Sequence, residues 1–334
     1  MSTIPDLLDL AFDARAAFFD AEHVSAFRMF NGFLEGCPAL SVDVYARTVL
    51  IHNYATFSAD DQSAVAQVWI LEKLPWVECI IVKNRSGQNA SQKRGHLVYG
   101  KNPDHKILEN GVWYAVDLSM NRDASFYMDT RNLRCWARAN LPGKTVLNTF
   151  AYTGSLGVAA LAGGADRVLQ LDRNPEFLKL ARQSYKLNGL SVISKDFLAQ
   201  DFFPAVAQLK HSGQTFDCAF IDPPFFATTA KGRVDLETGS TRLINKVRPL
   251  INDRGWLVAI NNALFVSGRE YLASLEALCS DGYLSLEQLV PIQEDFNAYA
   301  QTRAGDPPVD PTPFNHSTKI AILRMRRKSM PKEP

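Results

Sequence analysis

The chain of 334 residues has 36 Lys and Arg against 35 Asp and Glu, a net charge of +1 that argues against a surface coated with basic residues for nucleic-acid binding. No window reaches the roughly 18 continuous apolar residues that a membrane-spanning helix requires, and the N-terminus lacks the basic cluster of a secretory signal, so we expect a soluble, cytoplasmic protein. At this length two domains are expected, each with a core of its own.

Cysteine usage does not indicate a disulfide framework or a metal site. The chain has five cysteines, an odd number, and no two of them form a Cys-x-x-Cys pair. They lie far apart in the sequence, at Cys37, Cys79, Cys135, Cys218 and Cys279. This pattern favours separate buried thiols, and we expect no bound metal.

The first part of the chain has the pattern of a small α/β domain. Apolar residues recur at helical spacing between residues 5 and 24, which predicts an N-terminal amphipathic helix within residues 1–25. Short β-like runs and one helical stretch follow, at 39–42, 48–51, 60–73 and 78–82. We expect these elements to form a small α/β domain over residues 26–107 that binds the substrate.

Between residues 83 and 106 the chain is basic and polar. One acid, Asp104, lies among six basic residues in a stretch rich in Gly, Asn, Ser and Gln: Lys83, Arg85, Lys93, Arg94, Lys101 and Lys106. Such a loop can contact phosphates, so nucleic-acid binding is one hypothesis for it. A solvated basic loop without a partner is the alternative, and charge alone does not distinguish the two.

From residue 108 onward the elements are those of a larger α/β domain. The alternating pattern of residues 108–117 predicts a strand, and a helix is expected to run through residue 139 and to end before Pro142 and Gly143. Helical stretches and apolar strands then alternate, with helices at 175–187, 204–209 and 241–250 and strands at 219–221, 256–260 and 321–323. This alternation predicts an α/β fold of Rossmann-like type over residues 108–328, with helices on both faces of a mostly parallel sheet, followed by a basic tail over residues 329–334.

A glycine-bearing turn at residues 150–157 marks the start of this domain's first βαβ unit. An apolar run enters the turn, a helix of small residues follows, and a second apolar run ends in Asp172, a carboxylate placed to hold a ribose diol. Only Gly154 and Gly157 are present, whereas a pyrophosphate would require the Gly-x-Gly-x-x-Gly spacing. The turn therefore suits a cofactor without phosphates, such as S-adenosylmethionine. Alternatively, Asp172 only caps the next helix.

The sequence Asp222-Pro223-Pro224-Phe225 follows another apolar run. Two consecutive prolines fix φ and remove backbone donors, so a carbonyl at this point stays free to accept a hydrogen bond from a base. The aromatic side chain after them can stack on the face of that base. A rigid turn without a ligand is the alternative. The functional interpretation is favoured because open α/β sheets bind ligands at the carboxyl ends of their strands.

Several segments in this order resemble the class I S-adenosylmethionine-dependent methyltransferases that modify large-subunit ribosomal RNA. That family contains 5-methylcytosine-forming and 7-methylguanine-forming enzymes. The segments that carry the resemblance are residues 26–32 with 41–45, 109–112, 126–131, 148–154 and 221–226. The resemblance implies a seven-stranded, mostly parallel sheet, S-adenosylmethionine as cofactor and RNA as partner. The sequence leaves the oligomeric state open, with a homodimer as one expectation.

The resemblance also assigns the cofactor contacts. In that family one Tyr/Asp/Arg element and the glycine turn line the methionine end of the cofactor, one acid holds the ribose and a later acid meets the adenine amine. Here these contacts fall on Tyr127, Arg131, Phe150, Tyr152, Thr153, Gly154, Ser155, Asp172, Arg173, Asp201, Phe202 and Asp222. From the residues alone, Asp201 could instead cap a helix, and Arg131 could be an ordinary surface residue of a helix.

The end of the strand over residues 255–260 separates the branches of the family. A 5-methylcytosine enzyme attacks its base with a thiolate, which requires a cysteine here or beside the prolines. This chain has Asn261 and Asn262 instead, which resembles the 7-methylguanine branch. The candidate catalytic residues are therefore Asp222, Pro223, Pro224, Phe225 and Asn262. Methylation of an exocyclic amine of adenine or cytosine is an alternative, and so is a non-catalytic nucleoside-binding protein of the same fold.

Overall fold

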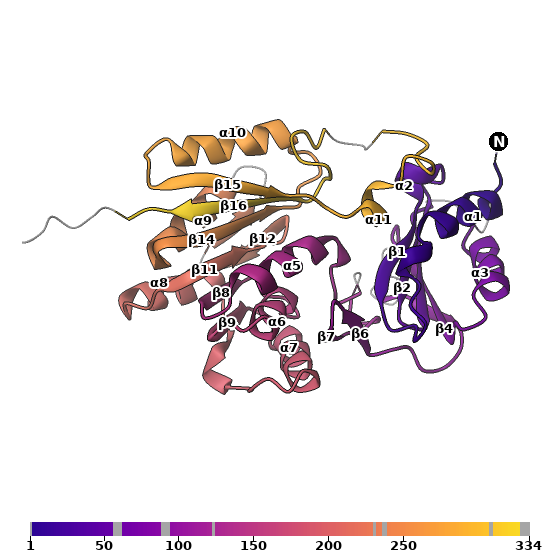
Figure 1. The fold of residues 1–334 in the computed structure, drawn as a ribbon, viewed down its shortest axis with the longest axis horizontal. Helices are drawn as coiled ribbons and strands as arrows, with labels where there is room; N and C mark the ends of the chain where they lie inside the picture. Colours follow the sequence, from indigo (N-terminus) through magenta and orange to yellow (C-terminus); the bar gives the residue numbers. More distant parts are fainter. Residues whose placement is uncertain are drawn as a thin grey trace, which may run out of the picture. The chain divides into compact units, whose positions relative to one another are not determined.

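The computed structural model describes residues 2–55, 62–87, 94–121, 124–229, 232–235, 239–306 and 310–327. The chain forms two compact units (Figure 1). Unit 1 consists of Met1–Arg131 and Gln293–Pro307, and unit 2 of Asn132–Ile292 and Pro308–Pro334. The division thus lies after Arg131 rather than after residue 107, and a later segment returns to unit 1. In the described part of the chain, no helix combines the length and apolar character that crossing a membrane requires.

Unit 1 contains a five-stranded sheet in the order β1-β2-β3-β4-β5. Its strands are Ala26–Asn31, Leu40–Tyr45, Thr48–Asn53, Cys79–Asn84 and His96–Tyr99. The parallel pair β3 and β4 is joined through α3 (Gln62–Lys73), and the other neighbours are antiparallel. Helices α1 (Ile4–Ala14) and α3 share one core with the sheet. The predicted strands at 39–42, 48–51 and 78–82 are confirmed, whereas β1 and β5 were not predicted.

The N-terminal helix is shorter than its apolar spacing suggested. Thr3 caps α1 in a reciprocal arrangement with Asp6, and the helix ends at Ala14, with a 3₁₀ turn, η1 (Ala16–Phe18), after it. A four-residue helix, α2 (Gly32–Glu35), follows β1.

Residues 106–115 form a hairpin, so the prediction of one strand there was wrong. Strands β6 (Lys106–Glu109) and β7 (Val112–Ala115) pair antiparallel across Asn110 and Gly111. Both turn residues have positive φ, 50° and 76°, as the two-residue turn favoured by Asn-Gly requires. A 3₁₀ turn, η2 (Met128–Thr130), then leads into α5 (Arg131–Asn140).

Unit 2 is built on a seven-stranded sheet in the order β10-β9-β8-β11-β14-β16-β15. In this spatial order the strands are Phe197–Ala199, Arg167–Asp172, Thr145–Thr149, Phe216–Ile221, Ile251–Asn261, Lys319–Met325 and Leu284–Val290. Strand β16 runs antiparallel to the other six strands of this sheet. The strand order reverses between β8 and β11, where open α/β sheets bind their ligands. The predicted Rossmann-like α/β fold is confirmed.

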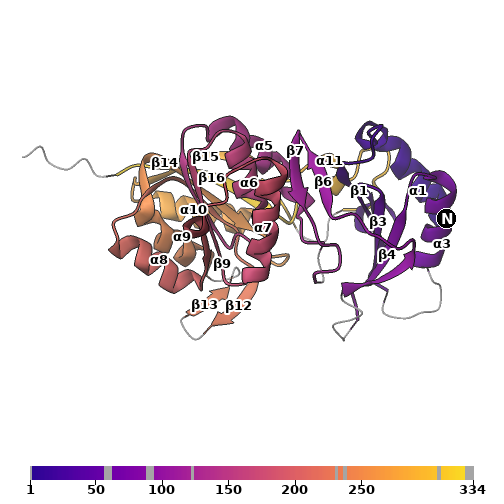
Figure 2. The same cartoon turned by 90° about the horizontal axis from the view of Figure 1, so that it is seen from below.

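Helices cover both faces of this sheet. One face packs against α5, α6 (Ser155–Ala162) and α7 (Pro175–Leu187), and the other against α8 (Phe202–His211), α9 (Ser240–Val247) and α10 (Gly268–Cys279). Figure 2 shows α6 and α7 on one side of the strands and α8 and α9 on the other. Further elements are η3 (Ser194–Asp196), η4 (Arg248–Leu250) and a hairpin of β12 (Phe226–Thr229) and β13 (Gly232–Asp235).

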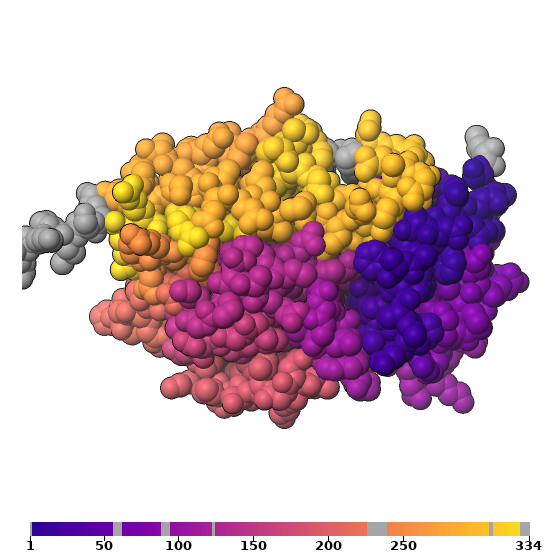
Figure 3. Space-filling model, viewed as in Figure 1, coloured from indigo at the N-terminus to yellow at the C-terminus, as the bar shows by residue number. Residues whose placement is uncertain are grey.

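The returning segment of unit 1, residues 293–307 with α11 (Glu294–Asn297), is tied to the N-terminal part by buried charges. The Arg15 guanidinium donates to both carboxylate oxygens of Glu35, at 3.0 and 3.1 Å, and to the backbone carbonyl of Asp295 at 3.0 Å. The Asp295 carboxylate accepts from the backbone N–H of Arg28 at 3.1 Å. Figure 3 shows this late segment against the indigo N-terminal residues.

Candidate functional site

The turn that follows β8 has an unusual backbone. Phe150, Tyr152 and Gly154 have positive φ values of 53°, 51° and 78°. Left-handed conformations in non-glycine residues cost free energy and persist where the surrounding structure enforces them, often at functional sites. Here Ala151 donates its N–H to Leu171 at 2.9 Å, and Gly154 donates to Ala151 at 2.7 Å. The turn therefore holds its shape at the end of the strand.

Gly154 and Gly157 are required by close packing against Gln170 and Ala181. A Cβ at Gly157 would lie 2.2 Å from Nε2 of Gln170, and one at Gly154 would lie 2.7 Å from Cβ of Ala181. Gln170 donates to the Gly154 carbonyl at 3.2 Å and accepts from Asn148 at 2.8 Å. This buried amide pair supports the turn from inside the domain, and it was not predicted from the sequence. The only indication in the sequence was one polar residue, Asn148 or Gln170, inside each of the apolar strands β8 and β9.

The Asp172 carboxylate links the ends of β8 and β9. Its two oxygens accept the backbone N–H groups of Tyr152 and Asn174, each at 2.8 Å. Burial raises the pKa of Asp172, and these two hydrogen bonds oppose the shift. The helix that follows is capped by Asn174, whose side chain accepts from Glu176 at 3.0 Å. Capping of α7 therefore does not explain Asp172, and its oxygens keep lone pairs for further hydrogen-bond donors.

Aromatic rings surround the same turn. Phe150 stacks on Phe202, with ring centroids 4.6 Å apart, and Tyr152 meets Phe177 edge to face at 4.5 Å. The other predicted cofactor residues around the turn are Thr153, which is buried, Ser155, the first residue of α6, and Arg173, which is exposed. The structure thus gathers residues 150–155, Asp172 and Phe202 at one end of β8 and β9.

Asp201 caps α8, because its carboxylate accepts the N–H of Phe203 at 3.1 Å. The preceding residue, Gln200, donates its N–H to the carbonyl of Asp172 at 3.1 Å, so Asp201 lies near the same sheet edge. The capping alternative accounts for the contact observed. An additional contact of Asp201 with the cofactor stays a prediction.

Asp222 begins the segment that leaves β11 beside this turn. Thr149 donates to the carbonyl of Phe220 at 2.7 Å, which joins β8 and β11 where the strand order reverses. Pro223 is buried, whereas Pro224 and Phe225 are exposed. Burial, and secondarily the negative charge of Asp222, raises the pKa of Tyr271. The proline segment therefore ends on an exposed aromatic side chain at the carboxyl edge of the sheet.

A buried lysine, which the sequence did not indicate, supports the segment that follows β14. Asn261 is buried and accepts the N–H of Ala263 at 2.9 Å, whereas Asn262 is exposed. Lys319 lies opposite Asn261 on β16, and its ammonium donates to the carbonyls of Ala263, at 3.0 Å, and Ser317. Burial lowers the pKa of Lys319 to about 8. The backbone N–H and the backbone carbonyl of Ala263 are thus both held by hydrogen bonds.

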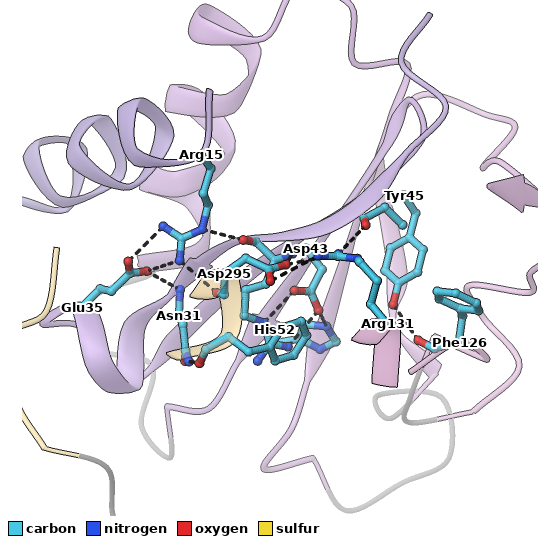
Figure 4. Close-up of polar contacts among 12 residues, drawn as sticks. Arg15, Asn31, Glu35, Asp43, Tyr45, His52, Phe126, Arg131 and Asp295 are labelled. Carbon is cyan, nitrogen blue, oxygen red and sulfur yellow. Dashed lines mark hydrogen bonds and ion pairs between the residues drawn. The ribbon is translucent and has the colours of Figure 1, made fainter. Parts of the chain in front are cut away.

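Tyr127 and Arg131 belong to unit 1. Tyr127 is exposed, and its carbonyl accepts from Thr130 at 2.9 Å. Arg131 is buried, so the alternative that it is a surface residue was wrong. It forms ion pairs with Glu109 and Asp295, both at 3.3 Å. Figure 4 shows Arg131 beside Asp295. These pairs give Arg131 a structural role inside unit 1, and its contact with the cofactor stays a prediction.

The basic segment is only partly available for phosphates. Lys83 is buried and donates to the carbonyl of Asn121 at 2.9 Å, so it is not a surface charge. Arg94 and Lys101 are exposed, and the Lys106 ammonium lies 4.6 Å from the ring centroid of Trp113. Lys93 and the expected basic tail over residues 329–334 lie outside the described residues.

We expect Asp172→Ala to weaken binding of S-adenosylhomocysteine by about 1–3 kcal/mol, since hydrogen bonds with a charged group are lost. Isothermal calorimetry measures this change. Asn174→Ala is the matched control: it removes the cap of α7 at a cost of about 1 kcal/mol in stability and leaves affinity unchanged. Unchanged affinity in Asp172→Ala would remove this carboxylate from the cofactor site.

Comparison with curated proteins finds relatives over most of the chain. The sequence is 29% identical to YwbD of Bacillus subtilis over 314 residues, which cover 90% of this chain and 77% of YwbD. It is 31% identical to the ribosomal RNA large subunit methyltransferase I of Aeromonas hydrophila over 228 residues, 66% of this chain and 56% of the relative. This chain thus matches little more than half the length of that relative.

A solved structure supports the fold, and a family model identifies the family. The structure of SMU.776 complexed with SAH is similar, with a TM-score of 0.82 at 22% sequence identity over 97% of this chain and 83% of that one. The model of the S-adenosylmethionine-dependent methyltransferase family matches residues 94–288, more than half of the chain, including the glycine turn and strands β8, β9, β10, β11 and β14. The protein therefore belongs to the S-adenosylmethionine-dependent methyltransferases.

Proposed function

We propose that this methyltransferase modifies a base of large-subunit ribosomal RNA, with a purine ring nitrogen as the favoured acceptor. One observation carries the proposal: Asp222 and Asn262 follow β11 and β14, neighbouring parallel strands, at the edge that also bears the turn after β8. The RNA class is supported by relatives named for ribosomal RNA large subunit methylation.

The residues around the turn suit S-adenosylmethionine, which supplies an electrophilic methyl group on a sulfonium. The space beside the two glycines is occupied by Gln170, so it is not open to a pyrophosphate. The Asp172 carboxylate has lone pairs left to accept hydrogen bonds from a ribose. Under this proposal the residues of the turn, with Asp201 and Phe202, surround the cofactor, whereas Tyr127 and Arg131 are contacts that only the family resemblance implies. Asp222 and Asn262 orient the base, and Phe225 stacks against it.

Direct displacement needs no enzyme nucleophile, because a purine ring nitrogen already has a lone pair and the site has only to align it with the methyl group. The cysteines agree with such a mechanism. Cys218 is buried inside β11, and burial raises the pKa of its thiol, which makes it a poor nucleophile. None of the others lies in the segments that follow β11 and β14.

Methylation of an exocyclic amine is the second candidate. It is favoured by the Asp222-Pro223-Pro224-Phe225 sequence, which resembles the base clamp of enzymes that act on adenine or cytosine amines. Mass spectrometry of nucleosides from large-subunit RNA of a deletion strain, compared with the parent strain, tests both. Loss of a ring-methylated purine supports the first candidate, loss of an N-methylated exocyclic amine supports the second, and an unchanged profile contradicts RNA as the substrate.

Reversing Lys93 and Arg94 to Glu should weaken RNA binding without changing S-adenosylhomocysteine affinity. The plot of log K against log salt has a negative slope, and each lost phosphate contact should make it shallower by about 1. Filter binding at several salt concentrations measures the slope. The control of equal charge change is Lys195→Glu with Arg254→Glu. Both residues are exposed; Lys195 precedes β10 and Arg254 lies near the start of β14, at the opposite sheet edge. An RNA affinity independent of salt would contradict the role of this segment.

A further inference from the structure

The loop after β14 exposes two large apolar side chains. Phe265 has 82% of its surface exposed, the highest value for a large hydrophobic side chain in the described residues, and Leu264 has 49%. Isolated apolar residues are common on protein surfaces. Two adjacent, highly exposed apolar side chains at the ligand-binding edge of a sheet suggest a binding role.

This loop is firmly held at both ends. At its start, the Ala263 N–H donates to Asn261 at 2.9 Å and the Ala263 carbonyl accepts from Lys319 at 3.0 Å. At its end, Ser267 and Glu270 form a reciprocal cap on α10, and Gly268 donates to the carbonyl of Asp310 at 2.8 Å. Only Asn262 and residues 264–266 lie between these anchors, so Leu264 and Phe265 are presented by a braced loop.

The position of the loop connects it with the proposed substrate. Strands β11 and β14 are parallel neighbours, with Ile221 paired to Ala259, so the segments that leave them emerge at the same edge. Phe225, 42% exposed, leaves β11 there, and Phe265 leaves β14. By contrast, exposed Ile193 precedes β10 and lies toward the opposite edge of the sheet.

We propose that Phe265, supported by Leu264, stacks on a nucleobase of the RNA substrate and thereby positions the target for methylation. This inference rests on the proposed function and adds a substrate-positioning residue to it. Aromatic rings stack on any base, since every base has a π face, and their apolar surface is then removed from water. A base splayed out of the RNA strand presents such a face. Lys319 and Asn261 act through the backbone by fixing the loop that carries the ring.

The test compares Phe265→Ala, Phe265→Leu and Phe265→Trp in the full-length protein. The probe is protein-free large-subunit RNA from a strain that lacks the gene, methylated with labelled S-adenosylmethionine. We expect Phe265→Ala to raise KM for RNA by roughly 5- to 100-fold, the range expected for loss of one stacked base. Phe265→Leu should stay impaired because it keeps apolar area without a ring, and Phe265→Trp should restore KM.

Controls separate this inference from the function on which it rests. Ile193→Ala removes an equally apolar side chain at the opposite edge and should leave KM unchanged. Thermal unfolding and S-adenosylhomocysteine affinity should be unchanged in every Phe265 variant, since the ring makes little contact with the protein. If the parent enzyme methylates this RNA and Phe265→Ala has the same KM, the inference is overturned and the proposed function stands. If the parent enzyme fails to methylate it, both fall.

Discussion

Asp222→Ala is expected to lower the rate of methyl transfer by about a hundredfold or more, because a small displacement of the acceptor from the line of attack costs that much. Single-turnover transfer of a labelled methyl group measures the rate. S-adenosylhomocysteine affinity, measured in parallel, separates positioning of the base from any contact of Asp222 with the cofactor. Asp222→Asn keeps one carbonyl acceptor and should lose less.

Replacement of all five cysteines by Ala provides the matched comparison for this result. If displacement is direct, the cysteine-free protein should keep most of its activity, provided that circular dichroism shows it folded. A covalent complex trapped on RNA that contains 5-fluorocytosine would show instead that a thiolate attacks the base. That outcome would place the protein in the 5-methylcytosine branch.

Asp295→Ala should lower the free energy of unfolding by about 3–5 kcal/mol, because it leaves a buried arginine without one of its two carboxylates. Asp295 is fully buried and lies 3.3 Å from Arg131. Urea unfolding followed by circular dichroism measures the loss. Arg47→Ala is the control, since its ion pair with Glu78 is exposed and should contribute no more than about 1 kcal/mol. A loss equal to that of the control would contradict this account of the network.

Local signals in the sequence were sufficient for much of unit 2. Helix α7 begins at Pro175 and ends at Leu187, as predicted, because Asn174 and Pro175 give a start signal that needs no tertiary contact. The βαβ unit around Gly154 followed from apolar runs and a turn in the same way. By contrast, the apolar alternation of residues 106–115 continues through a tight turn, so it resembles one strand, and only the Asn-Gly pair indicates a hairpin.

The supporting residues of the site could not be predicted, because their partners are distant in sequence. Arg131 and its partner Asp295 are separated by 164 positions in the sequence, and Lys319 and Ala263 by 56. A single Gln inside an apolar strand gives no indication that it will hold a glycine turn. Pattern and propensity describe local conformation, whereas buried polar partners are decided only when the sheet assembles.

Because residues 293–307 belong to unit 1, folding of that unit depends on the order in which the chain is synthesised. A ribosome releases the chain from its N-terminus, and domains often fold as they emerge. Here the first unit is incomplete until its last piece, Gln293–Pro307, has been synthesised, by which time most of the second unit already exists. A truncated product that stops at Arg131 would carry Arg15 and Arg131 without Asp295. For most of translation, Arg15 and Arg131 should therefore have only Glu35 and Glu109 as carboxylate partners, and their burial is completed when residues 293–307 are made.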